Sequence, residues 1–138
     1  MLEGVVPFPF EFARRYREKG YWRDKTLADE FAVVFERFRE RVALIDRDRQ
    51  FTYGEVDRLS ANLALNLLEA GLKPLDRVVL QLPNVAEFVL LYFALQKIGC
   101  IPIAALANHT TRDQLAVPGA RWVWRPAHDH LGIHRPRN

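Results

Sequence analysis

One segment determines how this chain folds: residues 51–109, which read FTYGEVDRLSANLALNLLEAGLKPLDRVVLQLPNVAEFVLLYFALQKIGCIPIAALANH. It opens with Thr52 and, three residues later, Glu55, which is the pair of a capping box that begins a helix. Gly71 supplies the left-handed residue at which such a helix ends. These signals predict a helix over residues 52–70, with apolar residues recurring at helical spacing along one side.

The second part of this segment predicts two strands joined by a helix. Residues 77–82 form a nearly continuous apolar run, which is typical of a strand covered on both faces. Pro83 ends the run, and Asn84 is expected to cap a helix over residues 84–98. Residues 100–105 then have the pattern of a second strand. A strand, a helix and a strand in this order favour a parallel, right-handed connection.

The first half of the chain supplies further helices and a hairpin. A short helix is expected over residues 10–19, and an amphipathic helix over residues 26–41, where Asp29 completes a capping box. Residues 42–52 predict a small β-hairpin with a polar turn. Together these patterns predict an α/β fold, with a partial parallel sheet and flanking helices.

Charge and composition exclude several classes of protein. The net charge of +3 arises entirely in residues 109–138, which hold five Arg and two Asp, whereas residues 1–108 carry fifteen basic and fifteen acidic side chains. A neutral body argues against a nucleic-acid partner. The most apolar stretch, residues 85–95, is too short to cross a bilayer, and the start lacks a secretion signal, so we expect a cytoplasmic protein with no membrane partner. The single cysteine, Cys100, is expected to be a small buried residue rather than a catalytic thiol.

Two parts of the sequence resemble conserved segments of the adenylate-forming (AMP-binding) superfamily. FTYGEVD (residues 51–57) is similar to a family segment written L-T-Y-x-E-L, and LQKIGCIPIAALA (residues 95–107) is similar to a second one. The front, PFPFEFARRYREKGYW (residues 7–22), and the ALANH ending resemble the aryl-acid–AMP ligases, such as 2,3-dihydroxybenzoate-AMP ligase or salicylate-AMP ligase. This resemblance covers residues 5–109. It implies the N-terminal fragment of the adenylate-forming large domain.

The resemblance also implies an activity, which is an ATP-dependent ligase reaction of siderophore biosynthesis. In the full-length family, 2,3-dihydroxybenzoate or salicylate attacks the α-phosphate of ATP and gives an acyl-adenylate and pyrophosphate. A carrier-protein thiol then takes the acyl group. ATP and Mg are therefore the implied cofactors of the full-length family, and an aryl carrier protein is its implied partner. Such chemistry needs backbone N–H groups around the phosphates, a carboxylate-held Mg²⁺ and a cation.

The sequence has no counterpart of the family residues that carry out this chemistry. The family's phosphate loop, S-G-T-T-G-x-P-K, and its later Y-G-x-T-E segment are absent, and no lysine of the chain lies in a Gly-rich context: Lys19, Lys25, Lys73 and Lys97. We therefore assign no catalytic, cofactor-binding or metal-binding residue. Thr52 and Glu55 match a family segment, but we interpret them as helix-capping residues. The fragment itself is expected to bind no cofactor and to be inactive, so its status as an enzyme stays open here.

Residues 110–138 differ in character from the ligase-like residues 1–109. They contain no lysine and show no sustained helical or strand period, and three of the four His lie among them. This change favours a divergent tail that is disordered or arose by a frameshift, and the sixteen Arg against four Lys agree with a GC-rich gene. On this hypothesis the chain is a truncated ligase. A missing downstream segment or a paralogue would then be the partner that completes it.

Two groups of residues near the end of the chain could suggest other functions. Zinc accepts histidine ligands, and three lie close together in the sequence: His128, His130 and His134. Nothing in the sequence around them organises a site, so we favour the interpretation that they bind no metal. Residues 121–125, Arg-Trp-Val-Trp-Arg, could stack on single-stranded nucleic acid, although we favour unstructured sequence. Two alternatives to the aryl-acid ligase stay open: a fragment of another acyl-CoA synthetase-type ligase, and a non-catalytic interaction or nucleic-acid-binding fragment.

Overall fold

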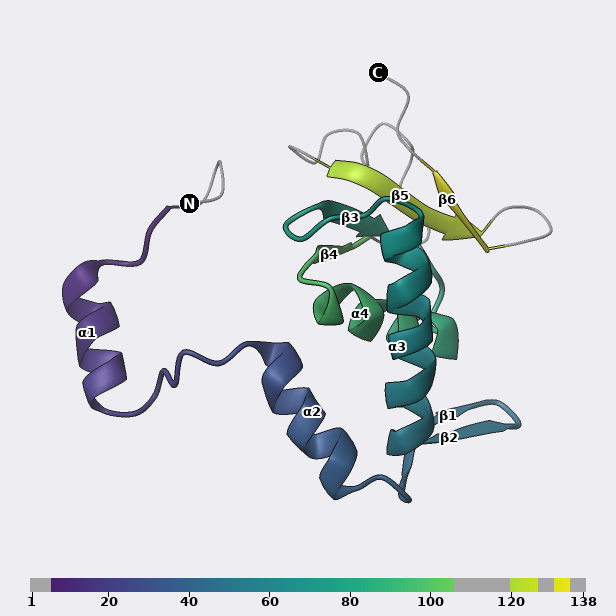
Figure 1. Ribbon diagram of the computed structural model, residues 1–138, viewed down its shortest axis with the longest axis horizontal. Coiled ribbons are helices and arrows are strands. Elements are labelled where there is room, and N and C mark those ends of the chain that lie inside the picture. The colour runs from purple at the N-terminus through teal and green to yellow at the C-terminus, as the bar shows by residue number, and fades with distance from the viewer. Residues whose placement is uncertain (1–5, 106–119, 127–130, 135–138) are drawn as a thin grey trace.

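The computed structural model describes residues 6–105, 120–126 and 131–134 (Figure 1). Along the chain the elements are α1 (Phe10–Glu18), α2 (Leu27–Arg37), β1 (Val42–Asp46), β2 (Arg49–Thr52), α3 (Tyr53–Glu69), β3 (Arg77–Leu80), α4 (Ala86–Lys97), β4 (Ile101–Ala104), β5 (Ala120–Pro126) and β6 (Leu131–His134). Helix α3 runs from the main sheet at one end of the body to the β1–β2 hairpin at the other, and α1 stands apart from the body. The fold is α/β, as expected.

The main sheet has four strands in the order β4-β3-β5-β6. Strand β3 pairs in parallel with both β4 and β5, whereas β6 pairs antiparallel with β5. The parallel β3–α4–β4 unit is the one that the sequence predicts. Strands β5 and β6 were not predicted, because their stretch shows no sustained alternation of apolar and polar residues. The Trp-Val-Trp run inside β5 nevertheless consists of residue types with high strand propensity.

The core lies where α3 and α4 pack against each other and against β3. Leu67 of α3, Val78 and Leu80 of β3, and Leu91 and Leu95 of α4 are all at most 1% exposed. Such burial is worth about 1.5–3 kcal/mol for each large aliphatic side chain, which makes this cluster the main source of stability. This packing also fixes the position of the end of β3, from which the chain leads into α4.

Helix α3 begins as the sequence predicts. The Thr52 hydroxyl accepts the Glu55 N–H at 3.1 Å, and the Glu55 carboxylate accepts the Thr52 N–H at 2.8 Å. The helix ends before Gly71, whose φ of 95° is the expected left-handed stop. The same reciprocal cap forms at Thr26 and Asp29, at the start of α2.

Helix α2 is shorter than predicted, because it ends at Arg37 and not at residue 41. The next residues serve the start of α3 instead: the carbonyls of Arg39 and Arg41 accept the N–H groups of Gly54 and Tyr53, each at 2.9 Å. These two N–H groups belong to the first turn of α3 and have no partner inside their own helix. The chain therefore leaves the helical path so that it can pair with α3.

The prediction for the start of α4 is wrong in one respect. Val85 and not Asn84 is the N-cap residue, and no side chain of the cap residue bonds to the helix. The first N–H of the helix, that of Ala86, donates instead to the Asp46 carboxylate at 3.1 Å. A sequence pattern cannot reveal this partner, since Asp46 lies 40 residues earlier, at the end of β1.

Candidate functional site

The carboxyl ends of β3 and β4 border a cavity of about 240 Å³. Because the two strands are parallel, both end at the same edge of the sheet, which is where α/β folds place their ligand sites. After β3 the chain supplies Leu82, Pro83 and Asn84; from β4 and the residue after it come Ala104 and Ala105; and Phe88 comes from the first turn of α4. We take this cavity, called the sheet-edge cavity below, as the candidate functional site.

The chemistry of the sheet-edge cavity is mainly apolar. Among the described residues that line it, Asn84 alone has a polar side chain, and the aromatic ring of Phe88 forms part of its wall. Such a lining suits the flat apolar part of a ligand with one hydrogen-bonding group. In the part of the chain that the structure describes, these lining residues carry no carboxylate, cation, hydroxyl or thiol, so they offer no group for acid–base or nucleophilic chemistry.

A charged cluster of three residues joins the hairpin to α4 beside this cavity. The Arg49 guanidinium contacts both oxygens of the Glu87 carboxylate, at 2.6 and 3.2 Å, and also pairs with Asp46. The pKa of Asp46 lies below its ordinary value, first because the Ala86 N–H donates to the carboxylate and second because Arg49 does. Arg49 likewise lowers the pKa of Glu87, and the two carboxylates raise that of Arg49. Each group therefore holds its partner in the charged form.

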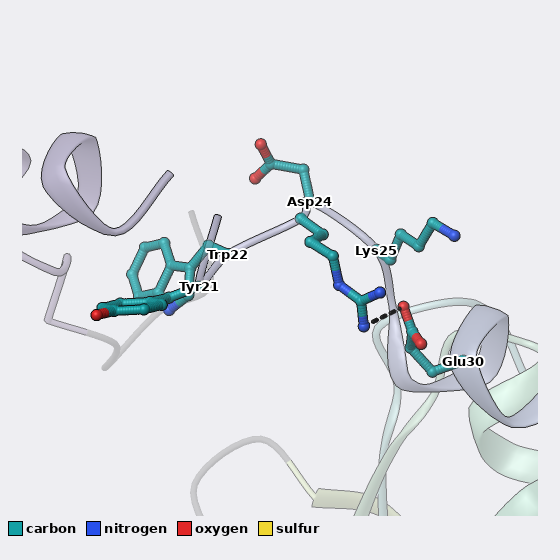
Figure 2. Close-up of a pocket in the computed structure, with 6 residues that line it drawn as sticks. Tyr21, Trp22, Asp24, Lys25 and Glu30 are labelled. Atoms are coloured by element: carbon teal, nitrogen blue, oxygen red, sulfur yellow. Dashed lines mark ion pairs between the residues drawn. The ribbon is translucent and has the colours of Figure 1, made fainter. Parts of the chain in front are cut away.

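A second hollow, of about 320 Å³, lies along the linker between α1 and α2 (Figure 2). Its lining combines aromatic, basic and acidic residues: Tyr21, Trp22, Arg23, Asp24, Lys25 and Glu30. Figure 2 shows that these side chains point in different directions, with Arg23 paired to Glu30 at 3.0 Å. Asp24 is bound from outside the hollow by Arg17, at 3.0 and 3.1 Å. Because Arg23 pairs with Glu30, Asp24 pairs with Arg17 and the side chains do not converge, we do not take the hollow as the site.

Lys97 lies on α4 and has a structural role. Its ammonium group pairs with the Asp57 carboxylate, donates to the Asp57 carbonyl at 3.1 Å and lies 5.5 Å from the centre of the Phe35 ring. Phe35 in turn packs edge-to-face on Phe93, with ring centres 5.1 Å apart. The contact fastens α2 and α3 to α4, so Lys97 is not available as a phosphate-binding cation.

The thiol of Cys100 is buried, as the sequence predicts. The residue is 6% exposed, and the thiol donates to the Lys73 carbonyl at 3.2 Å. Burial, with a smaller effect from the charge of Asp76, raises the pKa of the thiol to about 11. A thiol in this state is a poor nucleophile at neutral pH.

The structure places Thr52 and Glu55 where the sequence does, in the cap of α3. The histidines His128 and His130 lie outside the described residues, and so do the side chains of His134 and of the Arg-Trp-Val-Trp-Arg run in β5. Among the described residues no group of His, Cys, Asp and Glu could hold a metal ion. The charged cluster of Asp46, Arg49 and Glu87 was missed, because its members are 38 to 41 residues apart except for the pair within the hairpin.

Within the described part of the chain, none of the helices is both long and apolar enough to span a membrane.

Comparison with known proteins gives a consistent result. A family model described as AMP-binding enzyme matches residues 31–117, a range that runs past residue 109. Enterobactin synthase component E of Escherichia coli (strain K12) is 44% identical over 107 residues, and 2,3-dihydroxybenzoate-AMP ligase of Bacillus subtilis (strain 168) is 34% identical over 113 residues. These alignments cover 75% and 82% of this chain but 20% and 21% of the relatives. The chain thus spans about a fifth of the length of these relatives.

Solved structures also match this chain. The apo structure of MbtA from Mycobacterium smegmatis matches with a TM-score of 0.81 and 36% sequence identity, covering 87% of this chain and 23% of that one. The N-terminal subdomain of NpsA from Klebsiella oxytoca matches with a TM-score of 0.69 and 31% identity, covering 72% of this chain and 27% of that one.

Proposed function

Because the chain belongs to the family of AMP-binding enzymes, we propose that it forms part of the scaffold of an aryl-acid–AMP ligase of siderophore biosynthesis. The observation that carries the proposal is the joint match in sequence and structure. Relatives named as aryl-acid ligases align over most of this chain, and the β3–α4–β4 unit with its sheet-edge cavity lies inside the matched region.

The proposed parent reaction has two steps. The carboxylate of 2,3-dihydroxybenzoate or salicylate attacks the α-phosphate of ATP, and pyrophosphate leaves. A carrier-protein thiol then attacks the acyl carbon, and AMP leaves. In this proposal the complete enzyme uses ATP, Mg²⁺ and an aryl carrier protein, and it works in the cytoplasm.

Within this scheme the chain supplies structure and not chemistry. The printed sequence has no counterpart of the family's phosphate loop. The lining residues of the sheet-edge cavity that lie within 6–105 include no charged group. We infer that adenylation needs a further segment that brings the phosphate-binding groups, either downstream in the same gene or on a second chain. We also propose that the chain diverges from the family within residues 110–138, beyond the match that ends at residue 117, for example through a frameshift.

The proposal is tested by a chimera. Residues 31–105 of this chain replace the matching segment of the Bacillus subtilis 2,3-dihydroxybenzoate-AMP ligase, and ATP–pyrophosphate exchange is measured with 2,3-dihydroxybenzoate and with salicylate. We expect the chimera to retain exchange that depends on the aryl acid. The same graft into an acyl-CoA synthetase for aliphatic acids is the control. A folded ligase chimera without exchange, together with an active control chimera, would assign the chain to another branch of the family.

A further inference from the structure

The N-terminal end of α4 is capped by a residue that is remote in the sequence. The Asp46 carboxylate, at the end of β1, accepts the Ala86 N–H at 3.1 Å, and the Asp46 side chain is 11% exposed. This N–H is one of the donors that a helix leaves without an internal partner, and a capping oxygen normally comes from the residue just before the helix. Here Val85 stands in that place and has no side-chain oxygen to offer.

A second contact fastens the same two elements. Arg49, the first residue of β2, holds the Glu87 carboxylate with two guanidinium nitrogens, at 2.6 and 3.2 Å. Arg49 also pairs with Asp46, three residues earlier across the hairpin turn. Two-pronged guanidinium–carboxylate contacts fix orientation as well as distance. The hairpin therefore holds both the first N–H and the first acidic side chain of α4.

These contacts lie next to the sheet-edge cavity. The segment that leads into α4 lines the cavity with Leu82, Pro83 and Asn84, and the first turn of α4 adds Phe88. Because Asp46 supplies the cap, the Asn84 side chain is not used for capping and belongs to the cavity wall. The position of this wall thus depends on where the hairpin holds the end of α4.

We propose that the β1–β2 hairpin is a latch for the sheet-edge cavity, in which Asp46 and Arg49 act as positioning residues that hold the 82–88 segment in place. When the latch is closed, the start of α4 and the preceding loop form one rigid wall. When it opens, the first turn of α4 frays and the wall is lost. The inference does not depend on the proposed ligase function, because it concerns only how this cavity is built.

The charges around the latch define its response to pH. Asp46 faces Arg47 and Arg49 on the hairpin, and Glu87 faces Arg49 and Asp46. Helix α3 also packs on the hairpin. Its acidic residues Glu55 and Asp57 bind Thr52 and Lys97. Both latch carboxylates have a pKa below their ordinary values of 3.8 and 4.5. The contribution of these two carboxylates to the stability of the fold is therefore complete at a pH above their ordinary pKa values. It is lost as the pH falls through the lower pKa values that they have in the folded chain.

The experiment compares local hydrogen exchange in the full chain and in three variants at low micromolar concentration and neutral pH. Asp46→Ala removes the cap and one partner of Arg49, whereas Asp46→Asn keeps an oxygen that can accept the Ala86 N–H. Asp48→Ala, in the exposed turn of the same hairpin, is the matched control. We expect Asp46→Ala to raise the exchange rate of residues 82–89 by about fivefold, with a smaller rise in Asp46→Asn.

The control and a distant helix decide between the latch and general destabilisation. Exchange in Asp48→Ala and exchange of residues 60–69 of α3 should match the unmodified chain. Equal exchange of residues 82–89 in Asp46→Ala and in the unmodified chain would overturn the proposal. It would also be overturned by a uniform rise along the whole Asp46→Ala chain, or by exchange of Ala86 in the unmodified chain as fast as in an unfolded peptide.

A pH readout separates a capping charge from simple packing. The Ala86 amide-proton shift, followed by NMR as the pH is lowered from 7, should titrate with a midpoint below 3.8 in the unmodified chain. This transition should be missing in Asp46→Asn. A shift that follows the same curve in both chains would contradict the role of the Asp46 carboxylate.

Discussion

Gly54 lies where the first turn of α3 meets the segment that follows α2. Its N–H donates to the Arg39 carbonyl at 2.9 Å. A Cβ atom at this position would lie 2.9 Å from Arg39 Cγ and 3.2 Å from the Arg39 carbonyl oxygen. The glycine of the FTYGEVD segment is therefore explained by a close approach of two backbones.

Replacing Gly54 reverses an ordinary trend. Alanine is the better helix former, by about 1 kcal/mol at an unconstrained helical position. Here we expect Gly54→Ala to lower the free energy of unfolding by about 1–2 kcal/mol, because either Arg39 or the start of α3 must move. Urea unfolding followed by far-UV circular dichroism measures the change.

A double variant provides the control for this contact. Arg39→Ala removes the Cγ atom and leaves the carbonyl, so Gly54→Ala should cost less in the Arg39→Ala background. An increase in stability on Gly54→Ala in the unmodified chain would show that no close contact exists.

Cys100 should react slowly in the folded chain. Its pKa of about 11 leaves a much smaller thiolate fraction at pH 8 than the ordinary value of 9.0 does. We expect iodoacetamide to alkylate the native chain about a hundredfold more slowly than the chain in urea, with a rate that rises with pH up to about 11. Mass spectrometry after timed quenching measures both rates, and equal rates would mean that the thiol is exposed.

At the scale of elements, a sequence prediction is correct where the interacting residues are close in the sequence and fails where they are far apart in it. The cap of α3 joins Thr52 to Glu55, three residues apart, and was predicted correctly. The cap of α4 joins Ala86 to Asp46, 40 residues apart. The sequence instead predicts Asn84 as the capping residue. The end of α2 was placed too late, since the partners of Arg39 and Arg41 lie at the start of α3.

The sheet shows the same limit. The apolar run of β3 and the following helix identify a parallel unit without any knowledge of partners. Strands β5 and β6 depend on pairing with β3 and with each other, which no local period records. The sheet-edge cavity could be expected in outline from the parallel unit. The charged cluster that fixes its wall could not, because it needs the hairpin folded onto α4.

Strand β4 lies at one edge of the described sheet, and Pro102 occupies a particular place on it. The N–H groups of Ile101 and Ala105 donate to β3 and the residue before it, at 2.8 and 2.9 Å, so the alternate residues Pro102 and Ala104 face the open edge. Proline has no N–H, and the edge therefore offers fewer donors to another chain.

Restoring that donor should promote association. We expect Pro102→Thr to increase light scattering of the chain at micromolar concentration severalfold, since an added N–H lets a second strand pair there. Ala104→Thr is the control, because it adds the same side chain and raises strand propensity on the same strand but adds no backbone N–H. Equal scattering of both variants would mean that the side chain and not the N–H is responsible.

At the scale of the whole molecule, the chain is a scaffold with a well-packed centre and a partly uncovered surface. The cluster around Leu67, Leu80 and Leu95 is fully buried, whereas apolar side chains on the outside are not: Ile45, Leu65 and Leu75 are 60–64% exposed. This division agrees with a chain that spans about a fifth of its relatives. We infer that the remaining part of a ligase would cover these side chains and would bring the groups that bind phosphate.

The most direct test is ATP–pyrophosphate exchange by the purified 138-residue chain, with salicylate and with 2,3-dihydroxybenzoate. We predict no exchange that depends on either acid, because the sequence lacks the family's phosphate loop and the described lining residues of the sheet-edge cavity include no charged group that would hold the triphosphate. Saturable exchange that depends on the aryl acid and stays with the chain through further purification would contradict this account.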